Sequence, residues 1–189
     1  VNNPKSFSNV ANHWSKMNVE KLAARNIAFG KSEGIFAPDD YVTRAEFAVM
    51  ITRALAITEE EGTVNFEDVS GWYEKDISTA YSAGIINGRD DGKFYPNERI
   101  KRKDMAVMIC NALRFAGKEI TVENEQEILA KFVDNSTIDE YARGSVAYCA
   151  KAGIIMGRDT KDFDPDGNAT RAEATAIIER MLRYLDFIN

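Results

Sequence analysis

The stretch Thr43-Arg44-Ala45-Glu46 decides the fold, because it opens an amphipathic helix that recurs twice further along the chain. After Arg44, apolar residues stand at positions 47, 50, 51, 54 and 55, a spacing that places them along one face of an α-helix. The same spacing follows Arg102 and Arg171. Three equivalent apolar faces predict a central bundle of three helices around a pseudo-threefold axis.

An aromatic residue, a glycine and an arginine recur in each of the three copies. The aromatic-to-glycine step is 16 residues and the glycine-to-arginine step is 14 residues every time. The sets are Trp14, Gly30 and Arg44; Trp72, Gly88 and Arg102; and Tyr141, Gly157 and Arg171. A unit this short cannot bury its apolar face alone, so the copies are predicted to pack together, with binding sites in the seams between them.

Each copy is expected to form a helix, a loop and a second helix. The first helix ends at Asn26, Gly84 or Gly153, residue types that tolerate the positive φ of a helix C-cap. In the loop, the glycine is expected to allow a tight turn. A phenylalanine six residues later plugs the loop into the core, and a proline two residues beyond it fixes the backbone.

The copies occupy residues 7–57, 66–117 and 132–187 of a single module that spans residues 1–189. The acidic stretch Thr58 to Thr63 joins the first two copies. A helical linker is inserted at residues 118–131, where residues 123–130 are expected to add two helical turns. This insertion is the main break in the symmetry. The sequence leaves open how it packs and whether it covers part of one groove.

Bulk composition excludes several classes of protein. With 44% hydrophobic and 29% charged residues, the 189-residue chain is typical of a globular domain. A net charge of −6 argues against a nucleic-acid-binding protein, and no apolar run is long enough to span a membrane. Cys110 and Cys149 lie in helical patterns at non-equivalent repeat positions, and we expect buried free thiols there, with a disulfide or a metal site as the alternative.

Two of the three second helices begin with a capping box, in which threonine and glutamate satisfy each other's backbone amides. These boxes are Thr43 with Glu46 and Thr170 with Glu173, and each cap is worth about 1 kcal/mol. In the middle copy, Lys101 and Asp104 stand at the corresponding positions. Capping does not explain the arginine that follows in every copy, because a cation in the first turn opposes the helix dipole.

Two roles remain open for the three arginines: binding a ligand carboxylate through the planar guanidinium, or forming salt bridges between the copies. Two roles also remain open for the aromatic residues, core packing and a platform for the apolar face of a sugar. A carboxylated saccharide would use both groups at once.

With these residues in view, the chain resembles three tandem S-layer homology motifs. The resemblance covers nearly the whole chain, and three ordered copies make it specific. It rests on Phe7 to Val10, Phe66 to Val69 and Phe132 to Asp134; on the loops Gly30 to Pro38 and Gly88 to Pro96; and on Val42 to Glu46 and Ala169 to Glu173.

The resemblance implies an all-α, three-pronged spindle that anchors a secreted protein to the bacterial cell wall, outside the cell. It also implies binding of a pyruvylated, peptidoglycan-linked polysaccharide in grooves between the motifs. The arginines would meet the pyruvyl carboxylate, the aromatic residues would form the walls from a neighbouring motif, and the loop glycines would let the sugar approach backbone. Lys101, Asp104, Tyr141 and Lys161 depart from the pattern and imply unequal grooves.

Other functions are less well supported by the sequence. The alternative to a glycan anchor is a protein–protein scaffold in which the arginines only join the copies. No enzyme activity and no cofactor are expected, because His13 is the single histidine and no pair of carboxylates stands out. No metal site is expected, since the loops around Asp90 and Asp159 lack the acidic spacing of an EF-hand. The isolated module is expected to be monomeric.

Overall fold

The computed structural model describes residues 5–58, 66–158 and 161–189. The part of the predicted acidic join beyond Thr58, and Asp159, lie outside these ranges. The helices are α1 (Lys16–Ala23), α2 (Arg44–Ala54), α3 (Glu74–Ser82), α4 (Arg102–Phe115), α5 (Glu125–Leu129), α6 (Glu140–Lys151) and α7 (Arg171–Tyr184), with 3₁₀ turns at Ser8–Val10 and Asn135–Thr137. Within the described residues, β-pairing is limited to isolated bridges, so the predicted all-α class is confirmed.

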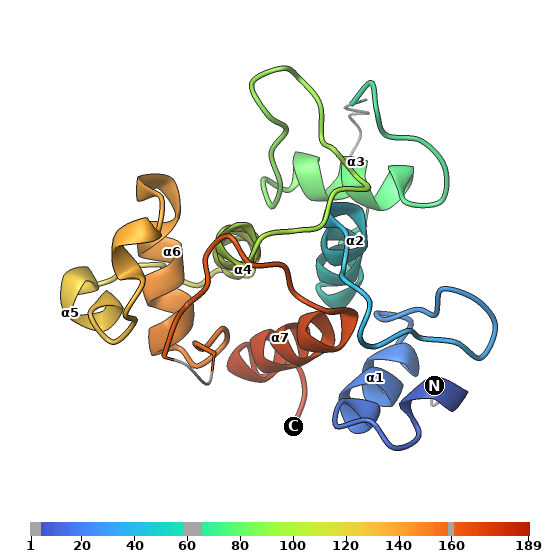
Figure 1. Cartoon of the computed structure of the whole chain (residues 1–189). Coiled ribbons are helices and arrows are strands. Elements are labelled where there is room, and N and C mark those ends of the chain that lie inside the picture. Colours follow the sequence, from blue (N-terminus) through green and yellow to red (C-terminus); the bar gives the residue numbers. More distant parts are fainter. Residues whose placement is uncertain (1–4, 59–65, 159–160) are drawn as a thin grey trace.

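The three second helices lie at the centre of the molecule, and three arms project from them. In Figure 1, α2, α4 and α7 occupy the middle, while α1, α3 and the pair α5 and α6 lie outside. Helix α2 contacts both α4 and α7. Most of the apolar positions predicted from the sequence are buried, and Phe47, Met105 and Ile178 are fully so, whereas Ala54 and Leu55 at the end of the first stripe are partly buried.

Each arm is built from two different copies of the repeat. Helix α3 of the second copy packs on α2 of the first copy, α6 of the third packs on α4 of the second, and α1 of the first packs on α7 of the third. The packing unit is therefore offset from the sequence repeat by half a copy. This ring of exchanges makes the three copies depend on one another.

Backbone hydrogen bonds close the same ring. At the start of α2, the Arg44 amide donates to the Glu98 carbonyl at 2.8 Å and the Ala45 amide donates to the Pro96 carbonyl at 3.0 Å. Equivalent bonds join α4 to the loop at Pro165 and Gly167, and α7 to the loop at Pro38 and Asp40. The first amides of a helix have no partner inside it, so each loop caps the helix of the preceding copy.

The capping boxes at Thr43 and Thr170 are both present, as predicted. Lys101 makes no side-chain cap at the start of α4, which leaves that end to the neighbouring loop. The predicted C-caps are also confirmed, because Asn26, Gly84 and Gly153 have φ values of 58°, 69° and 68°.

The loop glycines serve a different purpose from the predicted tight turn. Gly30, Gly88 and Gly157 are not among the residues with positive φ. A Cβ atom on Gly88 would lie 2.5 Å from the ring of Phe66, and one on Gly157 would lie 2.8 Å from the ring of Phe132. Glycine is required here because the phenylalanine that opens each copy packs directly on the loop backbone.

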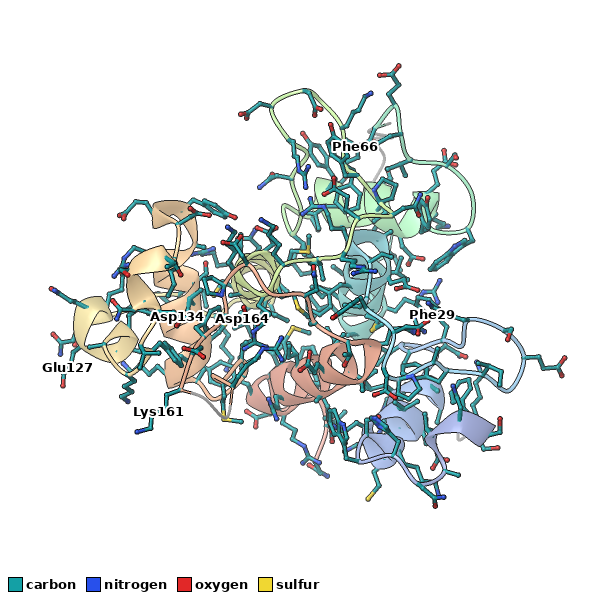
Figure 2. The ribbon with its side chains drawn as sticks, viewed as in Figure 1. Phe29, Phe66, Glu127, Asp134, Lys161 and Asp164 are labelled. Atoms are coloured by element: carbon teal, nitrogen blue, oxygen red, sulfur yellow. The ribbon has the colours of Figure 1, made fainter. Side chains whose placement is uncertain are left out.

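A polar side chain near the start of each copy fixes the shape of its loop. The Asp134 carboxylate accepts from the amides of Phe163 and Asp164, both at 2.8 Å, and Figure 2 labels Asp134 and Asp164 beside each other. Asp68 holds the second loop in the same way, and Asn9 accepts from the Phe36 amide. The residue after each loop phenylalanine is held at positive φ, as at Asp164, where φ is 58°.

The insertion forms less helix than predicted. Helix α5 covers Glu125–Leu129 only, because Asn124 adopts a left-handed conformation with φ of 59° immediately before it. The helix packs on α6, where the Arg143 Nε donates to Glu125 at 3.2 Å. It extends the third arm outward.

Candidate functional site

Groove 1 lies where all three copies meet. It is a cavity of about 600 Å³ whose lining includes Arg44 from the first copy, Gly88 from the second and Tyr141 from the third. These are an arginine, a glycine and an aromatic residue that the sequence analysis singled out. Each residue comes from a different copy, so the site exists only in the folded ring.

Groove 2 repeats this arrangement one step around the axis. It is a cavity of about 470 Å³ lined by Arg102 from the second copy, Gly157 from the third and Trp14 from the first. No residue of the insertion at 118–131 lines either groove. The insertion therefore covers neither of these two grooves.

In the third combination, Arg171, Gly30 and Trp72, a phenylalanine ring contacts both the tryptophan and the arginine. The ring of Phe29 meets Trp72 edge-on, with 4.8 Å between centroids, and also lies under the Arg53 and Arg171 guanidinium groups. Figure 2 labels Phe29 near α2 and the loop between α1 and α2. The corresponding positions in grooves 1 and 2 are Asn87 and Met156, which line the cavities.

The three repeat aromatics are on the surface. Trp14 is 63% exposed, Trp72 is 55% exposed and Tyr141 is 61% exposed. The core-packing role that the sequence left open for them is therefore wrong. Exposed tryptophan and tyrosine rings are suited to contact with a partner or a ligand.

The repeat arginines are buried and join the copies. The Nε atoms of Arg44, Arg102 and Arg171 donate to the carbonyls of Phe94, Phe163 and Phe36, at 3.0, 2.8 and 3.0 Å. Each guanidinium also stacks over the ring of the same phenylalanine, with 4.7 to 5.2 Å between the guanidinium carbon and the ring centroid. The structural role that the sequence left open for these residues is thus present in all three copies.

Arg171 is fully committed to the protein. Its Nη1 pairs with the Glu46 carboxylate at 2.5 Å, its Nη2 donates to the Phe29 carbonyl at 2.5 Å, and the side chain is 0% exposed. Burial is the main cause that lowers the pKa of Arg171 below its ordinary value, and the charge of Glu46 partly offsets it. In this structure Arg171 presents no surface to a ligand.

Arg44 and Arg102 retain unused donors. Arg44 Nη1 lies 3.6 Å from the Asp104 carboxylate, which is longer than a hydrogen bond, and Arg102 Nη2 donates to the Met156 carbonyl at 2.7 Å. Among the described residues, no hydrogen-bond acceptor is assigned to Arg44 Nη2 or Arg102 Nη1. Burial lowers the pKa of both side chains, yet an arginine stays charged in proteins.

Cationic side chains outnumber acidic ones in the lining of both grooves, although the whole chain has a net charge of −6. Several of these cations are paired with carboxylates just outside the lining, as Arg89 is with Glu98 and Arg158 with Asp164. The charged residues that line groove 1 are Arg44, Arg89, Lys101 and Lys103, with Asp90 and Asp104. Those that line groove 2 are Arg102, Arg158 and Arg180, with Glu173. Arginine and lysine side chains in both grooves are groups that can bind an anion.

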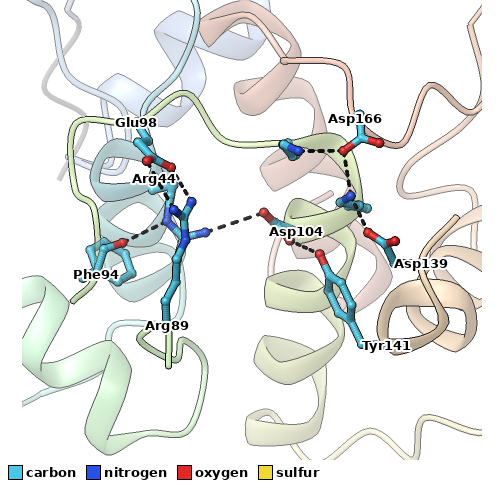
Figure 3. A network of polar contacts seen from close by, with 10 residues as sticks. Arg44, Arg89, Phe94, Glu98, Asp104, Asp139, Tyr141 and Asp166 are labelled. Atoms are coloured by element: carbon cyan, nitrogen blue, oxygen red, sulfur yellow. Dashed lines mark hydrogen bonds and ion pairs between the residues drawn. The ribbon is translucent and has the colours of Figure 1, made fainter. Parts of the chain in front are cut away.

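A network of ion pairs shapes the wall of groove 1, as Figure 3 shows. The Tyr141 hydroxyl donates to Asp104 at 2.7 Å. Partial burial of this hydroxyl, and then the hydrogen bond, raise the pKa of the phenol. Lys103 pairs with Asp139 at 2.5 Å and with Asp166 at 2.6 Å. The hydrogen bond to Asp104 orients the Tyr141 ring, and the raised pKa keeps its hydroxyl uncharged at neutral pH.

The sequence analysis missed several residues of the grooves. Arg89 and Arg158 directly follow the groove glycines in the same register, and this shared Gly-Arg-Asp segment was a signal that could have found them. Met156, Arg180 and Lys103 carry no signal in the sequence alone. They reach the grooves through packing between copies.

Comparison with known protein families finds the same three copies. The family model for the S-layer homology domain matches residues 6–48, 65–106 and 131–175. No helix in the described part of the chain has the length and apolar character needed to cross a bilayer. Among the described residues, no group of three or more histidine, cysteine, aspartate or glutamate side chains is placed to hold a metal ion.

Three relatives show the range of proteins that contain a similar segment. The chain is 41% identical over 182 residues to an amylopullulanase of Thermoanaerobacterium thermosulfurigenes, covering 94% of this chain and 10% of that protein. It is 40% identical over 181 residues to the exoglucanase XynX of Acetivibrio thermocellus, covering 94% and 16%. It is 28% identical over 177 residues to the S-layer protein EA1 of Bacillus anthracis, covering 92% and 20%.

The chain thus spans between a tenth and a fifth of the length of these relatives. The shared segment is found both in enzymes and in S-layer proteins, so it is the part that these otherwise different proteins have in common. Three tandem motif matches, together with the three-copy ring described above, determine the family. The chain belongs to the S-layer homology domain family and is a cell-wall anchoring module of the bacterial cell surface.

Proposed function

We propose that the module anchors its parent protein by binding a pyruvylated, peptidoglycan-linked wall polysaccharide in grooves 1 and 2. The observation that carries this proposal is that an arginine and an exposed aromatic residue meet in each of two equivalent cavities, whose linings contain more cationic than acidic side chains. A polymer with one carboxylate on each repeating unit matches that charge. It also offers apolar sugar faces to the exposed aromatic rings.

In groove 1, the free Nη2 of Arg44 would meet the carboxylate of the pyruvyl ketal. A charge-assisted hydrogen bond of this kind contributes about 1.5–3 kcal/mol. Tyr141 would support the apolar face of the sugar, and the backbone at Gly88 would lie beside it. Groove 2 would use Arg102, Trp14 and Gly157 in the same roles.

We infer that the third combination does not bind the glycan. Phe29 packs edge-on against Trp72, and Arg171 has its nitrogens bonded to Glu46, Phe29 and Phe36. This makes the module bivalent. Two sites on one polymer would raise the overall avidity above the affinity of either groove.

The direct test is calorimetric titration with a short wall saccharide that carries the pyruvyl ketal, beside the same saccharide after mild acid has removed it. We expect two sites per module and at least a ~10-fold weaker affinity without the ketal, equivalent to about 1.4 kcal/mol. Equal affinity for the two saccharides would refute carboxylate recognition. No binding of either one would refute the glycan assignment.

A second prediction tests the number of sites. Met156 is exposed in groove 2 at the position that Phe29 holds in the third combination. Met156→Phe should fill groove 2 and reduce the stoichiometry from two sites to one, with the melting temperature unchanged. Met156→Leu is the matched control and should keep both sites. If the phenylalanine variant still bound two saccharides, the side chain at this position would not determine whether a groove is open to ligand.

The alternative function is a protein–protein scaffold, and the buried inter-copy bonds of the arginines favour it. In that case the grooves are by-products of the packing, and the exposed aromatics would contact another protein. Binding to isolated cell walls separates the two, because a scaffold would not sediment with protein-free walls. For the parent protein, we propose a surface-displayed protein that carries further domains, as the relatives do.

A further inference from the structure

Cys110 and Cys149 face each other across the interface between α4 and α6. Their sulfur atoms lie 3.8 Å apart, both side chains are fully buried, and both thiols are free. The residues are 39 positions apart in the sequence, so this proximity arises only from the fold. We propose that this pair is a disulfide site that locks the third arm to the central bundle at the cell surface.

The surrounding contacts show that both sulfurs already point into the interface. Cys110 donates to the Ser145 carbonyl on α6 at 3.6 Å, and Cys149 donates to the Ala106 carbonyl on α4 at 3.7 Å. Each thiol therefore contacts the opposite helix, at the residue one helical turn before the other cysteine. Moving from contact distance to the bonded distance of about 2.05 Å requires side-chain rotation on both helices.

The other two arms lack the pair, although one keeps the geometry. At the position of Cys110, helix α2 carries Thr52, which donates to the Asp76 carbonyl on α3 at 3.3 Å. Ala80 stands opposite it, at the position of Cys149, so no cross-link is available there. The cysteines are thus specific to the arm that carries the insertion and the Tyr141 wall of groove 1.

The chemistry needs an oxidant, and a small-molecule disulfide supplies it by exchange. The Cys149 thiolate attacks the small disulfide, forms a mixed disulfide and releases one small thiol. The Cys110 thiolate then attacks the Cys149 sulfur and releases the second small thiol, so two protein thiols are oxidised and one disulfide is reduced. Because the folded interface is closed, the exchange would take place as the chain folds outside the cell, where disulfides persist.

The test is refolding of the denatured chain with oxidised glutathione, beside refolding with a reductant. We expect the oxidised product to be lighter by two hydrogen atoms, to show no reactive thiol when denatured, and to yield a single linked peptide pair from residues 110 and 149. Closing this long loop should raise the melting temperature by about 5 °C or more.

The single variants Cys110→Ala and Cys149→Ala are matched controls for the cross-link. Each should melt at the same temperature under oxidising and reducing conditions, whatever stability it loses from the removed side chain. Two titratable thiols in the refolded wild type, or a linked product that melts below the reduced form, would overturn the proposal.

Discussion

Replacing Arg171 with methionine is expected to be the most destabilising single change in this module, by about 3–5 kcal/mol. The side chain is 0% exposed and bonds three acceptors, which are Glu46 and the carbonyls of Phe29 and Phe36. Without the guanidinium, a buried carboxylate and two carbonyls lose their partner. At about 2–4 °C per kcal/mol, thermal unfolding should shift downward by about 10 °C.

The matched control lies on the same helix. Arg180 is half-buried and makes one long bond, to the Ile154 carbonyl at 3.4 Å, so Arg180→Met should change stability by less than about 1 kcal/mol. Urea titration followed by circular dichroism would measure both variants. If the free energy of unfolding of Arg171→Met were within about 1 kcal/mol of the wild-type value, Arg171 would not be needed to join the copies. A ligand-binding role for Arg171 would then be the better explanation.

Removing the two exposed groove aromatics together is expected to have the largest effect on glycan binding. Trp14 and Tyr141 expose more than half of their surface, so alanine at both positions should leave the fold nearly unchanged. An aromatic contact at the centre of a binding site is worth about 2 kcal/mol, which corresponds to about 30-fold in affinity. With both grooves weakened, binding to pyruvylated saccharide should fall below detection by calorimetry.

Trp72→Ala is the matched control for this double variant. Trp72 is the same kind of residue with similar exposure, but Phe29 packs edge-on against it and the arginine of its combination, Arg171, is 0% exposed. Glycan affinity and the number of sites should therefore match those of the wild type. If Trp72→Ala alone weakened binding ~10-fold, the third combination would be a working site and the module would not be bivalent.

Sequence patterns were sufficient to predict the central helices and the caps at their ends. The apolar spacing after each repeat arginine, the Thr43 and Thr170 capping boxes, and the left-handed C-caps at Gly84 and Gly153 all depend on residues close together in the chain. Local physics of this kind repeats faithfully wherever the sequence repeats. Helix α5 was the exception, because the conformation of Asn124 shortened it.

The sequence identified the arginine, glycine and aromatic residues of the grooves, but neither their other lining residues nor which residues share a groove. Arg44, Gly88 and Tyr141 belong to three different copies, and they meet because each first helix packs on the second helix of the preceding copy. The expected role of the loop glycines also changed. Their small size admits the ring of the phenylalanine that opens each copy, a contact that spacing along the chain does not reveal.

By itself, the sequence determined the all-α class, the three copies and the candidate residues, because these follow from patterns within each repeat. Only the tertiary structure decided that Arg171 pairs with Glu46, that Phe29 packs against Trp72, and that Cys110 faces Cys149. The physical reason is the same in each case. Burial, pairing and proximity between copies depend on how the ring closes, and ring closure is a property of three-dimensional packing.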